Sequence, residues 1–353
     1  MAIKAHDRLR PRPKIVRIVV IAFILTLVFF VTRSLLFPQH ELPVPTGPYA
    51  VSTVRFTYTD ENRIEVFARG GQKRKVNLTV WHPQPTGGPE TFPLVVSSHG
   101  GLGLETANES LYLELASHGF VVFAIGHPHH ALWTRDADGR ITFVNREYFR
   151  ALQRENARSD REQSLAYYRE WMAVRTGDIN LVLDSILRET DGDADGVYGL
   201  VDVRRIAVIG HSLGGSAALA MPRLRDDISA VIALEAPFLY DIVGVADGEF
   251  VWLEQAYSTP VLNIYSDSSW DHLSEWPQYG RNAAWLAEPP AAAINLHLPG
   301  AGHFSLTDLV LVSPLLVRLL EGEASGRNGA AYLQAVNQAC REFLVRQLGR
   351  SEE

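Results

Sequence analysis

Short hydrophobic runs alternate along most of the chain with longer segments of helical periodicity. These runs are mostly apolar at successive positions and rich in β-branched and aromatic residues, which is typical of strands buried on both faces. Strands of this kind separated by helices predict an α/β fold with a mostly parallel, doubly wound sheet. The runs that predict its strands are residues 92–98, 120–125, 204–210, 228–234, 259–266 and 292–298.

The segments around these runs predict the remaining elements. Apolar residues at helical spacing precede residues 204–210, and they are Ile179, Val182, Leu183, Ile186 and Leu187. Further helices are predicted over residues 109–119, from Leu213 onward and over 330–348. Nearer the N-terminus, three short β-branched and aromatic runs end at Asp, Gly or Pro and predict strands joined by turns. They are residues 54–60, 63–69 and 75–83.

The N-terminal segment predicts a membrane anchor. Residues 15–37 are almost continuously apolar, which is long enough for a helix to cross a bilayer. The basic residues before the segment predict a cytoplasmic N-terminus and a catalytic domain outside the cytoplasm. A cleaved signal peptide is the alternative, but no small-residue cleavage site precedes the proline-rich stretch. The predicted organisation is a basic tail (1–14), a single transmembrane helix (15–37), a linker (38–48) and one globular domain (49–353).

Composition and charge narrow the possible partners. The 353 residues are 46% apolar and 21% charged, which suits a folded globular body. The net charge of −7 hides a basic N-terminus, since seven Lys or Arg and one Asp lie within residues 1–37. An acidic body argues against binding nucleic acid. The single cysteine, Cys340, excludes an internal disulfide and a cysteine-based zinc site.

A serine between glycines follows the run 204–210. Residues 210–214 read Gly-His-Ser-Leu-Gly and lead directly into a predicted helix. A sharp turn from strand to helix needs residues with almost no side chain beside it. The arrangement resembles the nucleophile elbow of the α/β-hydrolases and predicts Ser212 as a nucleophile. The alternative is a serine in an ordinary turn.

A serine hydroxyl needs a base to take its proton, and the α/β-hydrolase chain order places that base downstream of the acid. The candidates are His272, His297 and His303. His297 lies inside a predicted strand, and His272 comes too early in the chain. His303 follows the last predicted strand in a glycine-rich loop, so we predict that His303 is the base.

The acid and the oxyanion hole come from the ends of other strands. Glu235 and Asp267 each end a predicted strand at the same edge of the sheet, and their positions alone do not choose between them. The oxyanion hole needs two backbone amides. We assign them to Leu213, which follows the nucleophile, and to Gly101 in the loop after residues 92–98.

Several stretches together resemble the platelet-activating factor acetylhydrolases of the plasma and type II intracellular kind and their bacterial relatives. The resemblance spans about residues 45–320 and is carried by FPLVVSSHGGLG, LASHGFVVFAIGHPHH, VIGHSLGG, ALEAP and GAGHFSLTD. It implies that Glu235 stands where the family has its aspartate, with Asp267 as the alternative acid. It also implies oxyanion amides at Gly101 and Leu213. The implied activity is hydrolysis of short or oxidised acyl esters of phospholipids without calcium or another cofactor.

The sequence therefore predicts a membrane-anchored serine esterase that acts on lipid or short-acyl phospholipid esters. The stretch His127–His130 contains three histidines but no carboxylate at helical spacing, so we interpret it as lining the substrate cleft and predict no metal. A hydrolase of dienelactones, polyesters or xenobiotic esters is the alternative enzyme. A non-catalytic binding module on the same fold is the alternative from another class.

Overall fold

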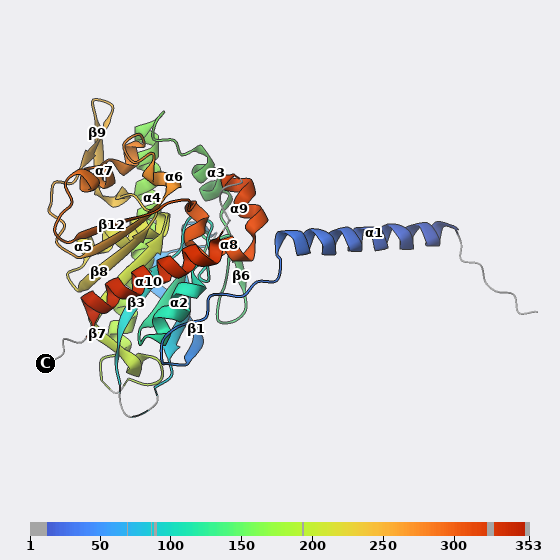
Figure 1. Ribbon diagram of the computed structural model, residues 1–353, viewed down its shortest axis with the longest axis horizontal. Helices are drawn as coiled ribbons and strands as arrows, with labels where there is room; N and C mark the ends of the chain where they lie inside the picture. The colour runs from blue at the N-terminus through green and yellow to red at the C-terminus, as the bar shows by residue number, and fades with distance from the viewer. Residues whose placement is uncertain are drawn as a thin grey trace, which may run out of the picture.

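One mostly parallel sheet forms the centre of the protein. The computed structural model describes residues 13–68, 70–85, 87, 90–192, 194–322 and 328–349, so most of the predicted basic tail lies outside the described residues. The eight-stranded sheet has the order β1-β2-β4-β3-β7-β8-β11-β12 (Figure 1). Its strands are β1 (Val51–Ile64), β2 (Lys73–Pro83), β3 (Phe92–Ser98), β4 (Val121–Gly126), β7 (Val201–His211), β8 (Ile228–Leu234), β11 (Val261–Ser266) and β12 (Ala293–Leu298).

The strand directions agree with the hydrophobic pattern. β2 runs antiparallel to both β1 and β4. The six strands β4, β3, β7, β8, β11 and β12 are parallel to one another, as the continuous apolar runs predict. The carboxyl ends of β3, β7, β8 and β12 therefore meet at one edge of the sheet. In open α/β sheets this edge is where ligands bind.

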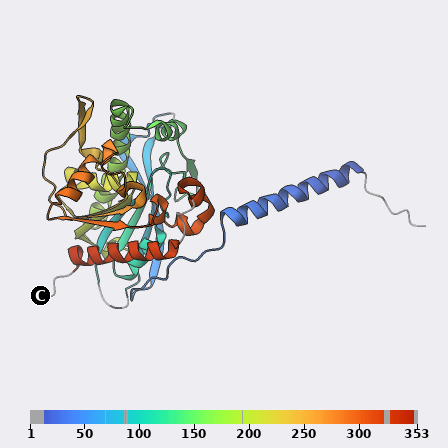
Figure 2. The same ribbon diagram turned by 45° about the horizontal axis from the view of Figure 1, so that its top comes forward.

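Helices cover both faces of the sheet. α4 (Arg161–Glu189) and α5 (Leu213–Leu224) pack with Leu94 and Val96 of β3 in one buried cluster. α2 (Glu109–Ser117) and α10 (Gly329–Leu348) pack on the other face with Val95 (Figure 1 and Figure 2). Successive side chains of a strand point to opposite faces, so both faces need apolar residues. The fold is thus the α/β architecture that the sequence predicts.

Smaller elements complete the domain. The helices are α3 (Arg146–Arg154), α6 (Asp267–Trp270), α7 (Gly280–Ala287), α8 (Leu309–Val312) and α9 (Pro314–Glu321). Two short hairpins pair β5 (Trp133–Arg135) with β6 (Ile141–Phe143) and β9 (Ile242–Ala246) with β10 (Glu249–Trp252). Single 3₁₀ turns lie at Tyr198–Leu200, Leu239–Asp241, Pro277–Tyr279 and His303–Leu306.

The predicted strand over residues 63–69 is wrong. Its first residues complete β1, which ends at Ile64, and the chain then turns towards β2. The N–H of Glu65 donates to the carbonyl of Gln72 (2.8 Å), and Gly70 and Gly71 have positive φ angles. Glycine adopts such angles without steric cost, so these two residues mark the turn of a hairpin and not the end of a strand.

The N-terminal apolar segment forms a separate helix, α1 (Pro13–Leu36), which extends away from the domain (Figure 1 and Figure 2). Where it meets the domain, Ser313 Oγ donates a hydrogen bond to the carbonyl of Leu36 beside α9. Among the described residues, no helix has both the length and the apolar character needed to cross a bilayer. The predicted span of residues 15–37 is therefore not confirmed. The side chains of Ile15, Val16 and Val19, which belong to that segment, lie outside the described part.

Candidate active site

Ser212 lies in a sharp turn between β7 and α5. Its φ of 52° and ψ of −124° are strained for a residue with a side chain. The surrounding glycines make the turn possible: a Cβ at Gly214 would overlap the carbonyl oxygen of Ser98, and one at Gly215 would lie 2.5 Å from Cβ of Ala236. The Gly-x-Ser-x-Gly pattern therefore reflects close backbone packing, and it places Ser212 at the carboxyl edge of the sheet.

His303 begins the 3₁₀ turn that follows β12, and its backbone is held on both sides. Its N–H donates to Ser268 Oγ (3.0 Å), and its carbonyl accepts a hydrogen bond from His211 Nε2 (3.0 Å). The rings of His211 and His303 lie 4.5 Å apart. Burial lowers the pKa of His303 to about 4, so its imidazole is neutral at pH 7. A neutral imidazole can accept a proton from a serine.

Glu235 follows β8 and is almost fully buried, with an exposed fraction of 1%. Its Oε2 accepts a hydrogen bond from the N–H of Ser266 (2.5 Å), whereas Oε1 has no hydrogen-bond partner among the described residues. Burial is the largest cause of its shifted pKa, which rises to about 7, although Ser269 and Ser266 oppose the rise. The carboxyl group therefore titrates close to neutral pH.

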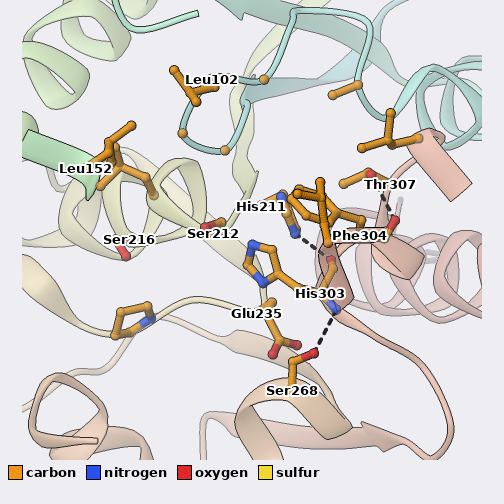
Figure 3. Close-up of a pocket in the computed structure, with 18 of the residues that line it drawn as sticks. Leu102, Leu152, His211, Ser212, Ser216, Glu235, Ser268, His303, Phe304 and Thr307 are labelled. Atoms are coloured by element: carbon orange, nitrogen blue, oxygen red, sulfur yellow. Dashed lines mark hydrogen bonds between the residues drawn. The ribbon is translucent and has the colours of Figure 1, made fainter. Parts of the chain in front are cut away.

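Ser212, Glu235 and His303 come together at one cavity. Figure 3 shows the imidazole of His303 between Ser212 and the carboxylate of Glu235. Across the described residues, no hydrogen bond joins Ser212 to His303 or His303 to Glu235. In substrate-free enzymes such contacts are often long and shorten when substrate binds.

Asp267 and the other two downstream histidines lie outside this arrangement. Asp267 Oδ1 contacts His297 Nε2 (2.8 Å), and Oδ2 accepts a hydrogen bond from the N–H of Gly300 (2.9 Å). The Asp267 side chain is 45% exposed. His272 contacts Glu275 at the surface. Of the two acids that the sequence left open, only Glu235 lines the cavity with His303.

Gly101 and Leu213 also line the cavity, as the predicted oxyanion hole requires. Leu213 is the first residue of α5, so its N–H has no acceptor within the helix. The N–H of Leu102 is engaged, since it donates to the carbonyl of His130 (3.2 Å). A Cβ at Gly100 would lie 2.9 Å from His211 Nδ1, so the loop approaches the serine only because Gly100 lacks a side chain.

The prediction that His127–His130 line the substrate cleft is wrong, since none of these four residues lines the cavity; His127 and His130 are the two that the core encloses. Both rings are fully buried outside the cavity. His127 Nε2 lies 2.9 Å from Ser98 Oγ, and His127 Nδ1 lies 2.8 Å from Asp178 Oδ2. These three residues have the connectivity of a catalytic triad, but exposed fractions of at most 1% keep substrate away. The described residues contain no cluster of three or more metal-ligating side chains.

The cavity has a volume of about 830 Å³, and apolar side chains make up most of its wall. They come from elements far apart in the sequence, and include Leu102, Leu152, Trp171, Leu239, Phe304 and Leu320. Few charged groups line it, among them Glu155, whose Oε1 accepts a hydrogen bond from Tyr168 (2.6 Å). The sequence pattern did not indicate Trp171, inside α4, or Glu155, just after α3, because helical periodicity does not show which side chains face a cavity.

Known proteins share both the sequence and the fold. The family described as platelet-activating factor acetylhydrolase, isoform II, matches residues 39–353. The platelet-activating factor acetylhydrolase of Gallus gallus is 27% identical over 251 residues, which cover 64% of this chain and 54% of the relative. Cutinase est1 of Thermobifida alba is 26% identical over 196 residues, 56% of this chain and 48% of the relative. The aligned part of this chain thus spans about half the length of these relatives.

A solved structure, a ferulic acid esterase from Streptomyces cinnamoneus, superposes with a TM-score of 0.66 at 22% identity. The superposition covers 89% of this chain and 94% of the esterase. At this identity the likeness shows the fold alone. The match to the family description over residues 39–353 places this chain in the platelet-activating factor acetylhydrolase isoform II family.

Proposed function

We propose that the protein is a serine esterase in which Ser212 is the nucleophile, His303 the general base and Glu235 the acid that orients His303. The observation that carries this proposal is the meeting of the three side chains at one cavity, each from the carboxyl end of a different strand. Gly101 and Leu213 supply the oxyanion amides. A non-catalytic binding module would not explain the strained backbone at Ser212, because a binding site does not require a serine presented as a nucleophile.

The proposed reaction passes through an acyl-enzyme. Ser212 Oγ attacks the ester carbonyl while His303 takes its proton, and the N–H groups of Gly101 and Leu213 stabilise the oxyanion of the tetrahedral intermediate. The intermediate then expels the alcohol, which receives the proton from His303. A water molecule, activated by His303, attacks the acyl-enzyme and releases the acid. Glu235 stabilises the imidazolium that forms in each half of the reaction.

We propose lipid esters with a short acyl chain as the substrate class. The apolar wall of the cavity favours a hydrophobic ester, and 830 Å³ is within the range of sites that bury a drug-sized ligand. The relatives named as platelet-activating factor acetylhydrolases favour a short acyl group on a phospholipid. The relative named as a cutinase makes a polyester or another hydrophobic ester the second candidate.

An acyl-chain series tests this substrate class. We expect kcat/KM for p-nitrophenyl esters to be highest for acetate to butyrate and to fall by about tenfold or more towards decanoate, roughly 1.4 kcal/mol. A phosphatidylcholine with an acetyl group at its second position should release acetate, whereas its long-chain counterpart should react far more slowly. A preference for long acyl chains would contradict the short-acyl proposal but would leave the esterase proposal intact.

We further propose that α1 anchors the protein in a membrane, with its N-terminus cytoplasmic and the catalytic domain outside the cytoplasm. Most side chains of α1 that the structure describes are apolar and exposed, including Phe23, Leu25 and Phe29. Exposure of so many apolar side chains to water is unfavourable, whereas contact with lipid is favourable. Because α1 joins the domain beside α9, which lines the cavity, this anchor would hold the active site close to the lipid surface.

Flotation on phosphatidylcholine vesicles tests the anchor. The full chain should float with the vesicles in a density gradient, and a variant that lacks residues 1–37 should stay at the bottom while it keeps its activity on p-nitrophenyl acetate. The proposal would fail if the shortened variant floated equally well. In cells, protease added outside the cytoplasmic membrane should digest the catalytic domain, and protection of the domain would overturn the proposed orientation.

A further inference from the structure

A fully buried arginine lies directly behind the loop that carries Gly101. Arg175 is on α4, has an exposed fraction of 0% and does not line the cavity. Its Nη1 donates to the carbonyl of His99 (2.6 Å), and its Nη2 donates to the carbonyl of Gly100 (3.2 Å). Its Nε lies 3.3 Å from His130 Nδ1. The guanidinium therefore binds two successive carbonyl groups of the loop.

The carbonyl of Gly100 has two more donors. His99 Nδ1 lies 2.7 Å from this oxygen, and the N–H of Gly103 donates to it over 3.1 Å. A carbonyl oxygen only accepts, so His99 must carry its proton on Nδ1. The other ring nitrogen, Nε2, is then free to accept the N–H of His127, as observed at 3.3 Å. Three donors thus hold the Gly100 carbonyl on the side of the loop that faces Arg175.

The geometry of the peptide bond links this carbonyl to the oxyanion hole. The peptide unit is planar and trans, so the C=O of Gly100 and the N–H of Gly101 point in opposite directions. With the carbonyl directed at Arg175, the N–H of Gly101 is directed to the other side of the loop. Ser212 is close to this peptide, since a Cβ at Gly100 would come within 3.3 Å of its Cβ, and the N–H of Gly101 has no acceptor among the described residues.

The electrostatic setting of Arg175 also indicates a role beyond stability. Arg74, another buried arginine, forms ion pairs with Glu65 and Asp178. Arg175 forms no ion pair with a carboxylate among the described residues, and its acceptors are neutral: two backbone carbonyls, the hydroxyl of Ser98 and the ring of His130. A buried charge without a partner of opposite sign costs several kcal/mol. An apolar residue would suit the buried face of α4 better if packing were the only requirement.

We propose that Arg175, assisted by His99, is a positioning residue that fixes the Gly100–Gly101 peptide so that the Gly101 N–H points at the reacting carbonyl. This inference rests on the proposed esterase function. Arg175 touches neither substrate nor Ser212, and its effect passes through the orientation of one backbone amide. Loss of this orientation weakens the stabilisation of the tetrahedral intermediate and leaves the binding of the ground-state ester almost unchanged.

The test compares Arg175→Lys with Arg63→Lys in the full-length protein. Arg63 also contributes to the buried charge cluster, through Asp178, but it contacts no part of the loop. Activity is measured with p-nitrophenyl acetate, and the number of active sites is counted by the nitrophenol released on phosphorylation by diethyl p-nitrophenyl phosphate. A trifluoromethyl ketone, whose adduct with serine carries an oxyanion, reports directly on the oxyanion hole.

For Arg175→Lys we expect kcat per counted site to fall by about 10- to 100-fold and KM to change by less than about threefold, because one oxyanion donor contributes about 10²–10³ in kcat. The inhibition constant of the ketone should rise by the same factor as kcat falls. In Arg63→Lys, kcat per counted site and the inhibition constant of the ketone should stay within about twofold of the wild-type values. Equal kcat and equal inhibition constants in the two variants would overturn the proposal.

A second variant covers the case in which Arg175→Lys does not fold, and the wild-type activity separates failure of this proposal from failure of the proposed function. If Arg175→Lys does not fold, His99→Ala takes its place, because it removes another donor to the same carbonyl and introduces no charge. Unchanged kcat and ketone inhibition in His99→Ala would overturn the proposal as well. A wild-type protein without activity on any ester would instead refute the proposed function, so the two failures are distinguishable.

Discussion

Ser212→Ala is expected to lower kcat for p-nitrophenyl acetate by about 10⁴–10⁶-fold, because removal of the nucleophile eliminates the acyl-enzyme route. The measurement is steady-state release of nitrophenol, with folding checked by thermal unfolding. Ser185→Ala is the matched control. Ser185 is a buried serine on α4 whose hydroxyl accepts a hydrogen bond from Arg188, and it lies outside the cavity. Its variant should keep kcat within about twofold.

His303→Ala should lower kcat by a similar factor, and the double variant Ser212→Ala/His303→Ala should be no slower than Ser212→Ala alone. Residues that act as a unit show this loss of additivity, because the second substitution removes a partner that no longer has a function. Substantial turnover by Ser212→Ala would refute the nucleophile. A wild-type protein that binds esters without turnover would instead support the binding-module alternative.

Glu235→Gln is expected to lower kcat by about 10³–10⁴-fold, whereas Asp267→Asn should keep it within about threefold. An amide at position 235 cannot stabilise the imidazolium of His303, and such replacements of the acid cost about 10⁴ in serine proteases. Asp267 is half-exposed and contacts His297 and Gly300, so its charge is remote from the cavity. Kinetics of the two purified variants on p-nitrophenyl acetate check this prediction.

The pH profile provides an independent readout of Glu235. Because burial raises the pKa of Glu235 to about 7, kcat/KM of the wild type should fall as pH decreases through about 7 and the carboxyl group takes up a proton. In Glu235→Gln this group no longer titrates, and the fall in residual activity should move towards the pKa of His303, which burial lowers to about 4. A large loss in Asp267→Asn with an unchanged profile in Glu235→Gln would assign the acid to Asp267.

Much of the fold follows from local sequence pattern. Continuous apolar runs indicate strands covered on both faces, and the observed strands β3, β4, β7, β8, β11 and β12 begin and end within a few residues of those runs. The turn at Ser212 is also a local property, since neighbouring glycines decide whether the backbone can bend so sharply. The run 63–69 shows where local pattern fails. It has the composition of a strand, but the register of β1 with β2 shifts between Asp60 and Ile64, and β1 ends at Ile64.

Local sequence pattern did not choose between the two candidate acids of the triad. Glu235 and Asp267 both end strands at the same edge, and they differ only in what surrounds their side chains. Glu235 is buried at the cavity beside His303, whereas Asp267 turns towards β12 and contacts His297. Those surroundings depend on how α6 and the loop after β12 pack, so the sequence left both acids open.

By itself, the sequence determined the α/β architecture, the turn that presents Ser212 and the order in which candidate groups follow the strands, because these features depend on periodicity and on the backbone preferences of nearby residues. Only the tertiary structure decided which groups meet. It brought Glu235 and His303 to the cavity, buried the Ser98–His127–Asp178 arrangement away from substrate, and placed Arg175 behind the Gly100 carbonyl. Contacts between residues far apart in the chain depend on how helices and loops pack over the sheet edge, which no local pattern encodes.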